Sequence, residues 1–534
     1  MPALIIHGHF YQPPRENPWT GIVEEEPSAA PFHDWNERIH IECYRANAFA
    51  SIKGPATGEE QLVNNYAHIS FNFGPTLLNW LAQNHPDTYK RILEADRDSI
   101  LQHGGHGNAI AQAFGHAILP LCNDHDLRTQ IRWGLADFRY RFGREAEAMW
   151  LPETACSDPV MDALIDEGLR FVILAPQQAA RIRVLTSENS DRVDNEVSTG
   201  SDSDRVNPAQ DSVWSQVNEA TLDTSVPYRY LHRDAPHKSI NVFFYNGLTS
   251  RAIAFENLLR SSRELVDAFA RAVDDKDMLN VATDGETYGH HFKFGDLCLA
   301  YALESDAPAR GFQITNYAEY LDARPAKSEV EIYNGPDGEG TSWSCQHGVG
   351  RWIRDCGCHT GGAAGWNQRW RKPLRQALDY LRDENISYFE ATRGTLFIDP
   401  WASRDDSIAL VLDPQHSREQ FLFEHAGRRA SPDQQWRALT YLELQRMLLL
   451  MYTSCGWFFN DISGIETIQT LKYAARAIDL MEQLDLPSAR GRFLEILSAA
   501  KSNRTELGTG ADIYGKFVEP LSVAVVVQDV ALAK

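Results

Sequence analysis

The sequence has few basic residues, few cysteines and no long hydrophobic run. Its 51 Lys and Arg are outnumbered by 73 Asp and Glu, so the formal net charge is −22. This sign argues against non-specific binding to nucleic acid or to an anionic membrane. No hydrophobic run reaches the length of a membrane span. The opening MPALIIHGHF has no basic stretch before its short apolar run, so we expect no signal peptide.

Cysteine is scarce and unevenly spread, with eight residues in a chain of 534. Such a distribution does not suggest a disulfide framework. We therefore expect a cytoplasmic protein with reduced thiols. Hydrophobic residues make up 43% of the chain and charged residues 23%, which is typical of an ordinary globular enzyme.

Short apolar runs alternate with amphipathic stretches over roughly the first 300 residues. The runs include ALII at 3–6, RFVIL at 170–174 and MLNVA at 278–282. Helical patterns such as PVMDALIDEGL at 159–169 lie between them. This alternation predicts an α/β fold with a parallel sheet or barrel.

Composition divides the chain into three expected parts. Residues 1–310 are expected to form the catalytic α/β part, with a polar surface insertion rich in Ser and Asp at about 185–225. Residues 311–370 are a connecting segment rich in Gly, Trp and Cys that is expected to line the cleft. Residues 371–534 carry apolar residues at three- and four-residue spacing, which predicts a mainly helical C-terminal domain.

Two carboxylates stand where predicted strands end. Glu153 follows Trp150 and Pro152, and the proline ends the strand because it has no backbone donor. Asp284 ends the strand that begins near residue 278. Cleavage of a glycosidic bond needs such a pair, one group as nucleophile or base and the other to protonate the leaving oxygen. The alternative for both is a structural role in ion pairs or helix caps.

Two histidines, His7 and His9, stand two residues apart on the first predicted strand, so both point the same way. Nothing adjacent supplies the third donor that a metal site usually needs. Hydrogen bonding to a polyhydroxylated ligand is therefore favoured, and a buried structural pair is the alternative. His116 lies in a second segment with glycines, which is a poor phosphate cradle because no Gly-Lys-Ser/Thr element follows.

Four segments in this order resemble the ordered motifs of glycoside hydrolase family 57. They are HGHFYQP at 7–13, GHAILPL at 115–121, MWLPETA at 149–155 and ATDGETYGHH at 282–291. Residues 341–370, TSWSCQHGVGRWIRDCGCHTGGAAGWNQRW, resemble a later family motif rich in Ser-Trp and His/Arg-Trp, but depart from its commoner amylase-type version. The resemblance covers most of the chain and is best over residues 1–300.

That family comprises α-glucan-active amylases, 4-α-glucanotransferases, branching enzymes and pullulanases. The resemblance implies an incomplete (β/α)7 barrel followed by a C-terminal helical domain, a retaining mechanism, and an α-glucan or maltooligosaccharide substrate. We expect no cofactor and no metal. By motif match, Glu153 would be the nucleophile and Asp284 the general acid/base. Glu286 is the nearest competitor for the acid role, since in an extended segment it would point to the same side as Asp284.

The resemblance also implies which residues line the sugar subsites. Side chains from the connecting segment are expected to reach the sugar as well, whereas the aromatic stripe at 457–459 is expected to be core of the helical domain. The substrate-binding candidates are His7, His9, Gln12, His116, Trp150, Glu286, His290, Trp343, Arg351, Trp352 and Asp355.

A group of thiols and imidazoles lies close together in the sequence: Cys345, His347, Cys356, Cys358 and His359. Such residues could hold zinc. The spacing does not match the usual Cys-x2-Cys knuckles, and a second close cysteine pair is missing. Packed cysteines in a Gly-rich loop are therefore favoured, and no metal site is predicted.

Two other functions stay open at this point. A metal-dependent carbohydrate deacetylase would need an Asp/His/His triad, and the His7/His9 pair has no clear acidic partner. A carbohydrate-binding protein that has lost its activity would not need both Glu153 and Asp284. Hydrolysis and glycosyl transfer differ in whether water or a sugar hydroxyl reaches the intermediate, which depends on loops and acceptor subsites.

Overall fold

The computed structural model describes residues 1–54, 58–185, 213–413 and 415–522. Strand β1 (Ala3–Phe10) lies at the centre of its main sheet, and all eight of its residues are buried. It pairs in parallel with β12 (Met278–Asp284) on one side and with β4 (Ser70–Phe73) and β13 (Gln313–Ile314) on the other. An apolar strand that is buried on both faces is typical of a parallel sheet covered by helices.

Parallel pairing continues beyond β4. An isolated bridge joins Phe71 to Ala109, just before β5 (Ala111–Gln112), which pairs with β6 (Met149–Trp150). A second bridge leads to β7 (Phe171–Leu174), which pairs with β11 (Ser239–Phe244). The predicted α/β class with a parallel sheet is therefore confirmed. The intervening helices are α1 (Trp35–Ile39), α2 (Arg45–Ala48), α3 (Pro75–Asn84), α4 (Pro86–Gln102), α5 (Asp124–Phe142), α6 (Asp158–Asp166), α8 (Gly247–Phe255), α9 (Ser262–Val273), α10 (Gly295–Tyr301), α11 (Ala307–Ala309) and α12 (Tyr317–Ala323).

The sheet that contains β7 and β11 is extended by strands of mixed direction. They are β10 (Tyr228–Leu231), β14 (Ser328–Ile332), β8 (Ala179–Val184) and β9 (Ser215–Gln216). A hairpin of β2 (Ala50–Lys53) and β3 (Glu60–Val63) stands apart. Of the predicted insertion at 185–225, residues 186–212 lie outside the described part of the chain. From residue 213 the insertion contributes β9, which pairs antiparallel with β8.

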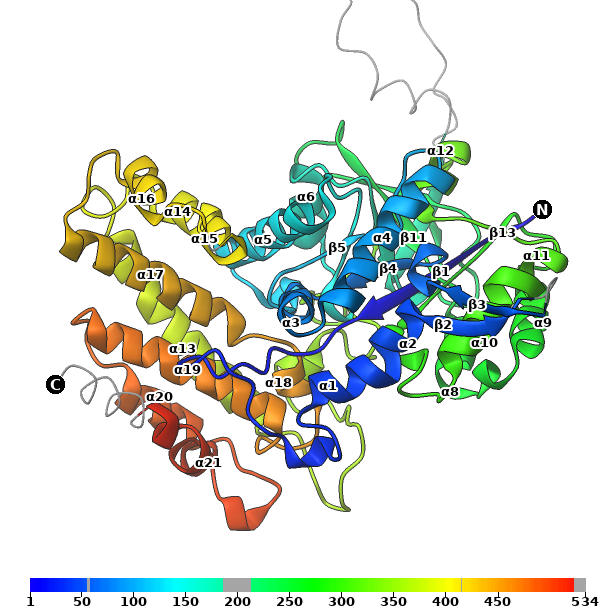
Figure 1. Ribbon diagram of the computed structural model, residues 1–534. Helices are drawn as coiled ribbons and strands as arrows, with labels where there is room; N and C mark the ends of the chain where they lie inside the picture. Colours follow the sequence, from blue (N-terminus) through cyan, green and yellow to red (C-terminus); the bar gives the residue numbers. More distant parts are fainter. Residues whose placement is uncertain (55–57, 186–212, 414, 523–534) are drawn as a thin grey trace, which may run out of the picture.

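From residue 371 to residue 522 the described chain is mainly helical, as predicted (Figure 1). A second hydrophobic core lies among these helices, and Trp352, Trp370 and Trp457 are almost fully buried in it. Helix α17 begins with a capping box, in which Ser431 and Gln434 satisfy each other's backbone amides. The helices are α13 (Arg371–Glu390), α14 (Pro400–Asp406), α15 (Ile408–Leu412), α16 (Arg418–Ala426), α17 (Pro432–Leu450), α18 (Cys455–Phe458), α19 (Ile465–Gln483), α20 (Arg490–Leu497) and α21 (Gly510–Phe517).

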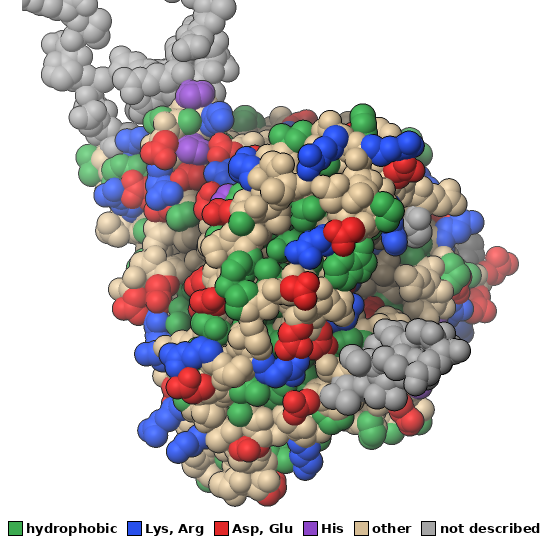
Figure 2. Space-filling view, turned by 90° about the vertical axis from the view of Figure 1, so that its left-hand side faces the viewer, with side chains coloured by type: hydrophobic (Ala, Val, Ile, Leu, Met, Phe, Trp, Pro, Cys, Tyr) green, Lys and Arg blue, Asp and Glu red, His purple; other side chains and the backbone are tan. Residues whose placement is uncertain are grey.

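On the molecular face drawn in Figure 2, acidic and basic side chains are interspersed rather than gathered by sign. Among the described residues, no helix combines the length and the apolar character that crossing a bilayer requires.

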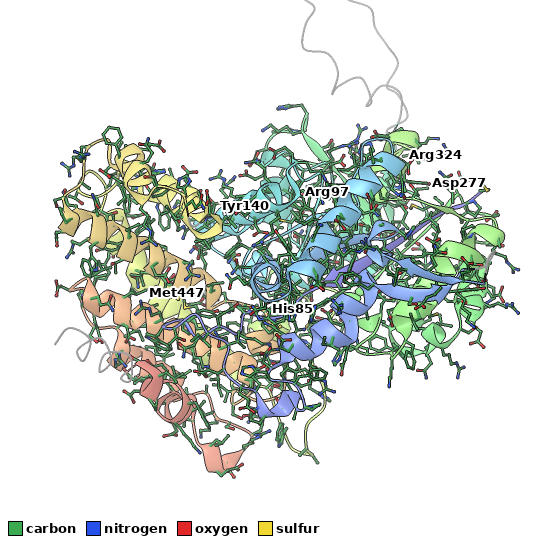
Figure 3. The ribbon with its side chains drawn as sticks, viewed as in Figure 1. His85, Arg97, Tyr140, Asp277, Arg324 and Met447 are labelled. Atoms are coloured by element: carbon green, nitrogen blue, oxygen red, sulfur yellow. The ribbon has the colours of Figure 1, made fainter. Side chains whose placement is uncertain are left out.

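Different residues lie at the two ends of the strands of the main sheet. Asp277, directly before β12, and Arg324 lie at the edge where β12 begins (Figure 3). Asp284 lies at the other end of β12. On that side the α/β part meets the helical part, since Ala117 and Thr453 form an antiparallel bridge. The carboxyl ends of parallel strands are where α/β folds place their ligand sites.

Candidate active site

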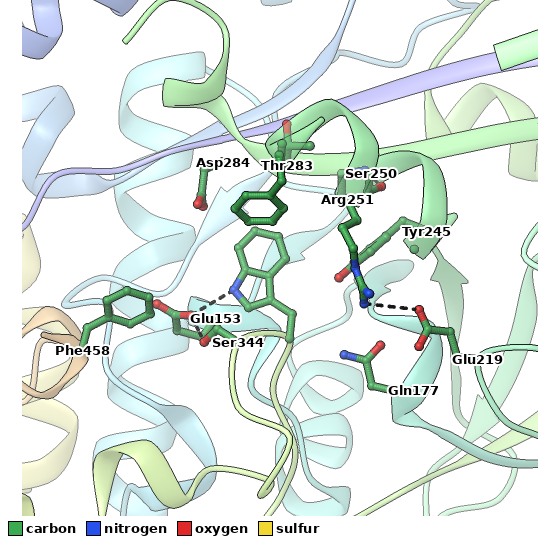
Figure 4. Close-up of a pocket in the computed structure, with 15 residues that line it drawn as sticks. Glu153, Gln177, Glu219, Tyr245, Ser250, Arg251, Thr283, Asp284, Ser344 and Phe458 are labelled. Carbon is green, nitrogen blue, oxygen red and sulfur yellow. Dashed lines mark hydrogen bonds and ion pairs between the residues drawn. The ribbon is translucent and has the colours of Figure 1, made fainter. Parts of the chain in front are cut away.

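Glu153 lies in the short 3-10 helix η5 (Pro152–Thr154), directly after β6, and has a left-handed backbone with φ of 60° and ψ of 22°. Thr154 (φ 49°) and His116 (φ 53°) share this uncommon conformation. Non-glycine residues in this region are strained, and such strain is often retained where it aims a functional side chain. Here the turn directs the Glu153 carboxylate into a pocket that it shares with Asp284 (Figure 4).

The connecting segment holds the Glu153 carboxylate in place. Ser344 Oγ donates to Glu153 Oε2 at 2.6 Å, and the indole Nε1 of Trp343 donates to the same oxygen at 2.9 Å (Figure 4). Burial raises the pKa of Glu153, whereas these two donors and the positive charge of Arg351 oppose that rise. The contacts therefore favour the ionised carboxylate.

Asp284 ends β12, and the pairing register places it beside His9 of β1. Its side chain faces the open pocket, so solvent reaches it, but protein atoms surround the carboxyl group. That enclosure raises the pKa of Asp284 well above its usual value, and the negative charges of Glu286 and Glu153 raise it further. Two carboxyl groups in one pocket thus differ in environment, one supplied with donors and the other facing like charges, as in an acid–nucleophile pair.

Glu286 is buried and its carboxylate is already occupied. Its Oε1 accepts hydrogen bonds from Tyr44 Oη at 2.6 Å and from the Tyr11 amide at 3.1 Å. Burial raises the pKa of Glu286 to about 7. The expected extended geometry after Asp284 is wrong, because a 3-10 turn, η8 (Gly285–Thr287), begins there. Glu286 is not among the residues that line the pocket.

Histidine and aromatic rings form a stack beside the carboxylates. The His9 ring stacks on Trp150 at 5.1 Å between centroids and on His116 at 5.3 Å, and His7 stacks on Trp150 at 4.7 Å. Tyr11 stacks on His116 at 3.6 Å and on His9 at 6.0 Å between centroids. Burial lowers the pKa of both His7 and His9 to about 3, so their rings are neutral at neutral pH.

Neutral rings fit a continuous chain of hydrogen bonds. Asn72 Nδ2 donates to His9 Nδ1 at 2.9 Å, and His9 Nε2 lies 3.2 Å from His116 Nε2. His116 Nδ1 in turn lies 2.7 Å from Ser454 Oγ in the helical part. Asn72 also donates to Gln112 Oε1 at 2.7 Å. The network orients the histidines and ties the sheet to the helical part.

Arg351 contacts the pocket-lining residue Phe458. The Arg351 guanidinium lies over the Phe458 ring, 4.2 Å from its centroid, and Nη1 donates to the Phe458 carbonyl at 3.3 Å. Phe458 lines the pocket (Figure 4) and also packs against the core of the helical part, so its expected core role holds only in part, whereas Trp457 is fully buried there as predicted.

Of the eleven predicted substrate-binding residues, only Trp343 is among those that line this pocket. Four of the other ten also lie outside the ring stack and the contacts described above. Gln12 donates to the Tyr11 carbonyl and accepts from Arg15, each at 3.0 Å. His290 pairs with Glu42 and packs edge-on to Trp35. Trp352 is buried in the helical core, and the exposed Asp355 accepts from the Gln368 amide at 3.3 Å.

The sequence reasoning did not single out several residues that line the pocket. Ser344 adjoins Trp343, which was singled out. Tyr245 directly follows β11, so the strand-end argument that identified Glu153 and Asp284 would also have found it. Glu219 and Arg251, 3.9 Å apart, carried no such signal because they meet only in the folded chain (Figure 4).

A family model described as glycosyl hydrolase family 57 matches residues 23–333, which is more than half of the chain. The chain belongs to this family. A second model, described as a domain of unknown function (DUF3536), matches residues 366–533. The family 57 match therefore covers the α/β part from residue 23 onward, with both carboxylates, and the second match covers the helical part.

Individual relatives of this family 57 chain agree with that assignment. Alpha-amylase 1 of Dictyoglomus thermophilum is 27% identical over 107 residues, which are 20% of this chain and 15% of the length of that relative. An exo-type maltose-forming amylase from Pyrococcus sp. ST04 superposes with a TM-score of 0.64 at 15% identity, covering 92% of this chain and 82% of that one. A branching enzyme from Pyrococcus horikoshii gives 0.52 at 14% identity, with 97% and 96% covered. These structures share the fold.

Proposed function

We propose that this family 57 chain is a retaining glycoside hydrolase or transglycosylase that acts on α-glucans or maltooligosaccharides. The observation that carries the proposal is that Glu153 and Asp284 line one pocket, where burial raises the pKa of both but only Glu153 has hydrogen-bond donors and a positive charge that oppose the rise. A retaining enzyme needs one ionised and one protonated carboxyl group at the scissile bond. The names of the relatives, an amylase and a branching enzyme, support an α-glucan as substrate.

In the proposed reaction, the Glu153 carboxylate attacks the anomeric carbon while the Asp284 carboxyl donates its proton to the departing glycosidic oxygen. The products of this step are a glycosyl ester on Glu153 and a shortened glucan. Asp284, now ionised, accepts a proton from water or from a sugar hydroxyl, whose oxygen displaces Glu153. Water completes hydrolysis, whereas a sugar hydroxyl completes transfer.

The pocket walls suit a sugar. Trp343, Tyr245 and Phe458 offer ring surfaces for the apolar faces of glucose units, and Arg251 and Gln177 offer donors for hydroxyls. We assign His7, His9, His116 and Trp150 to orienting the central subsite, because their rings form the stack beside Asp284.

We further propose that β12, β1, β4, β5, β6, β7 and β11 form the incomplete (β/α)7 barrel of the catalytic part, residues 1–310. The continuous series of parallel pairings supports it, and Asn246 at the end of β11 donates to the Asn280 carbonyl of β12 at 2.8 Å. Residues 311–370 would then line the cleft, and residues 371–534 would form the helical domain that closes it. A cytoplasmic location is supported by the eight cysteines, all of which are free thiols.

The proposal is tested by incubating the protein with maltooligosaccharides and amylose and following the products by chromatography and by proton NMR. Shortened or rearranged α-glucans, with the α-anomer released first, are the expected result. Release of the β-anomer first would contradict the retaining mechanism. Absence of turnover on every α-glucan and activated α-glucoside would contradict the enzymatic proposal.

A further inference from the structure

Four donor atoms from the connecting segment converge on one point. The sulfur atoms of Cys345, Cys356 and Cys358 and a ring nitrogen of His347 all lie within 4.8 Å of one another. We propose that these four residues bind one zinc ion in a structural site with three thiolates and one imidazole. This proposal concerns the metal alone and does not depend on the proposed reaction.

The separations match tetrahedral coordination. Zinc binds sulfur at about 2.3 Å and nitrogen at about 2.0–2.1 Å, so a tetrahedral site separates two sulfurs by about 3.8 Å and a sulfur from a nitrogen by about 3.5 Å. The Cys345–Cys356 sulfur atoms are 3.8 Å apart, and the Cys345–Cys358 sulfur atoms are 3.7 Å apart. Cys358 Sγ lies 3.5 Å from His347 Nδ1. A disulfide would bring two sulfurs to about 2.05 Å, far closer than any of these pairs.

The local backbone explains how an unusual spacing forms such a site. The ligands come in two arms, Cys345-x-His347 and Cys356-x-Cys358, each with a single residue between its donors. Gly357 lies between the last two cysteines with φ of 83°, a conformation that favours glycine. Because each arm has one residue between its donors and not two, the usual Cys-x2-Cys spacing did not predict this cluster from the sequence. His359 is not part of it, because its Nδ1 accepts the Gly361 amide at 3.2 Å.

A buried cation balances the charge of the site. Three thiolates and one zinc ion carry a net charge of −1, and the fully buried Arg371 lies beside them. Its Nη1 donates to the Cys358 carbonyl at 2.9 Å, and its Nε donates to the Trp457 carbonyl at 2.9 Å. Metal sites commonly have such supporting groups around their ligands.

The proposed zinc site lies next in the sequence to the residues that contact Glu153. Cys345 directly follows Ser344 and Trp343, the two residues that donate to the Glu153 carboxylate. A zinc ion would close the loop from residue 345 to residue 358 and so restrict the segment that holds these donors. This consequence for catalysis, unlike the metal site itself, rests on the proposed function.

The experiment measures zinc per chain in the purified full-length protein by plasma mass spectrometry. About one zinc per chain is expected in the wild type, as for a structural site. His347→Ala and Cys358→Ser should lose most of it. His359→Ala, a neighbouring exposed histidine, and Cys298→Ser, a thiol of α10, are the matched controls and should retain it.

Cobalt provides a second measurement that does not require the cysteine variants to fold. Wild-type protein stripped with a chelator and loaded with Co²⁺ should show thiolate-to-cobalt charge-transfer absorption and intense visible bands of tetrahedral cobalt. Wild-type protein with less than about a tenth of a zinc per chain and no cobalt bands would overturn the proposal. Equal zinc in His347→Ala and His359→Ala would overturn the assignment of the ligands. Metal content is measured without substrate, so failure here is distinct from failure of the proposed reaction.

Discussion

Trp343 is bound to Glu153 at two points: its indole Nε1 donates to the carboxylate at 2.9 Å, and its backbone amide donates to the Glu153 carbonyl at 3.0 Å. The side chain and the backbone of one residue are therefore fixed by another residue 190 positions away. A nucleophilic carboxylate must be aimed within a few tenths of an ångström, so in the proposed reaction the segment that carries Trp343 would position the nucleophile.

The first prediction concerns the two carboxylates. We expect Glu153→Gln to lower kcat/KM on maltooligosaccharides on the order of 1,000-fold or more, because no nucleophile remains. Asp284→Asn should lose about 100-fold to 10,000-fold, but should lose less on an aryl α-glucoside whose leaving group needs no proton. Asp277→Asn, at the opposite edge of the sheet, is the control and should match the wild type. Equal losses of Asp284→Asn on both substrates would contradict its role as acid.

The second prediction separates Asp284 from Glu286. Glu286 contributes a negative charge that raises the pKa of Asp284, so Glu286→Gln should lower that pKa and move the basic limb of the pH–rate profile to lower pH. At the acidic optimum the rate should stay within about tenfold of the wild type, since the acid itself is retained. Glu286 would instead be the acid if Glu286→Gln abolished the basic limb of the pH–rate profile and lowered the rate only on substrates whose leaving group needs a proton.

A third prediction follows from the donors to Glu153. Ser344→Ala and Trp343→Phe each remove a hydrogen bond that lowers the pKa of Glu153, so this pKa should rise. Since the ionised form is the nucleophile, the acidic limb of kcat/KM should move to higher pH. Ser407→Ala removes a comparable buried hydroxyl that donates to the Arg404 carbonyl, and should leave the profile unchanged. An unshifted acidic limb in both site variants would show that these donors do not control the ionisation.

The fourth prediction tests Phe458 as a pocket wall. Phe458→Ala removes ring surface from the pocket and the partner of the Arg351 guanidinium, so KM should rise by about tenfold while the fold is retained. Phe423→Ala, an exposed ring on α16, is the matched control. Thermal melting of both variants should match the wild type. If Phe458→Ala strongly lowered the melting temperature and left KM unchanged, Phe458 would stabilise the core and would not bind substrate.

Local sequence pattern was sufficient for the class of fold. Apolar runs that end in Trp150 and Asp284 predicted buried parallel strands, and the spacing after residue 371 predicted the helical part. Strand-end reasoning, together with the ordered motifs, selected Glu153 and Asp284, and the structure brings both into one pocket.

The failures have a physical cause. The predicted position of the Glu286 side chain was wrong because the backbone forms a 3-10 turn where an extended segment was expected. That turn depends on the contacts of Glu286 with Tyr44 and Tyr11. Phe458 follows a buried tryptophan, and sequence pattern cannot tell which of two adjacent rings faces a cleft. The cluster that includes Cys345 needed three-dimensional distances, because its spacing matches no common knuckle.

The contact between His116 and Ser454 has a consequence for how the protein becomes active after synthesis. These residues are 338 positions apart, yet Ser454 donates its amide to the His116 carbonyl at 2.9 Å and its hydroxyl lies 2.7 Å from the ring. The ring stack beside the pocket is thus held by a segment that leaves the ribosome long after both carboxylates. A nascent chain that ends before residue 454 would expose a half-built pocket, so activity should begin only after the helical part has docked.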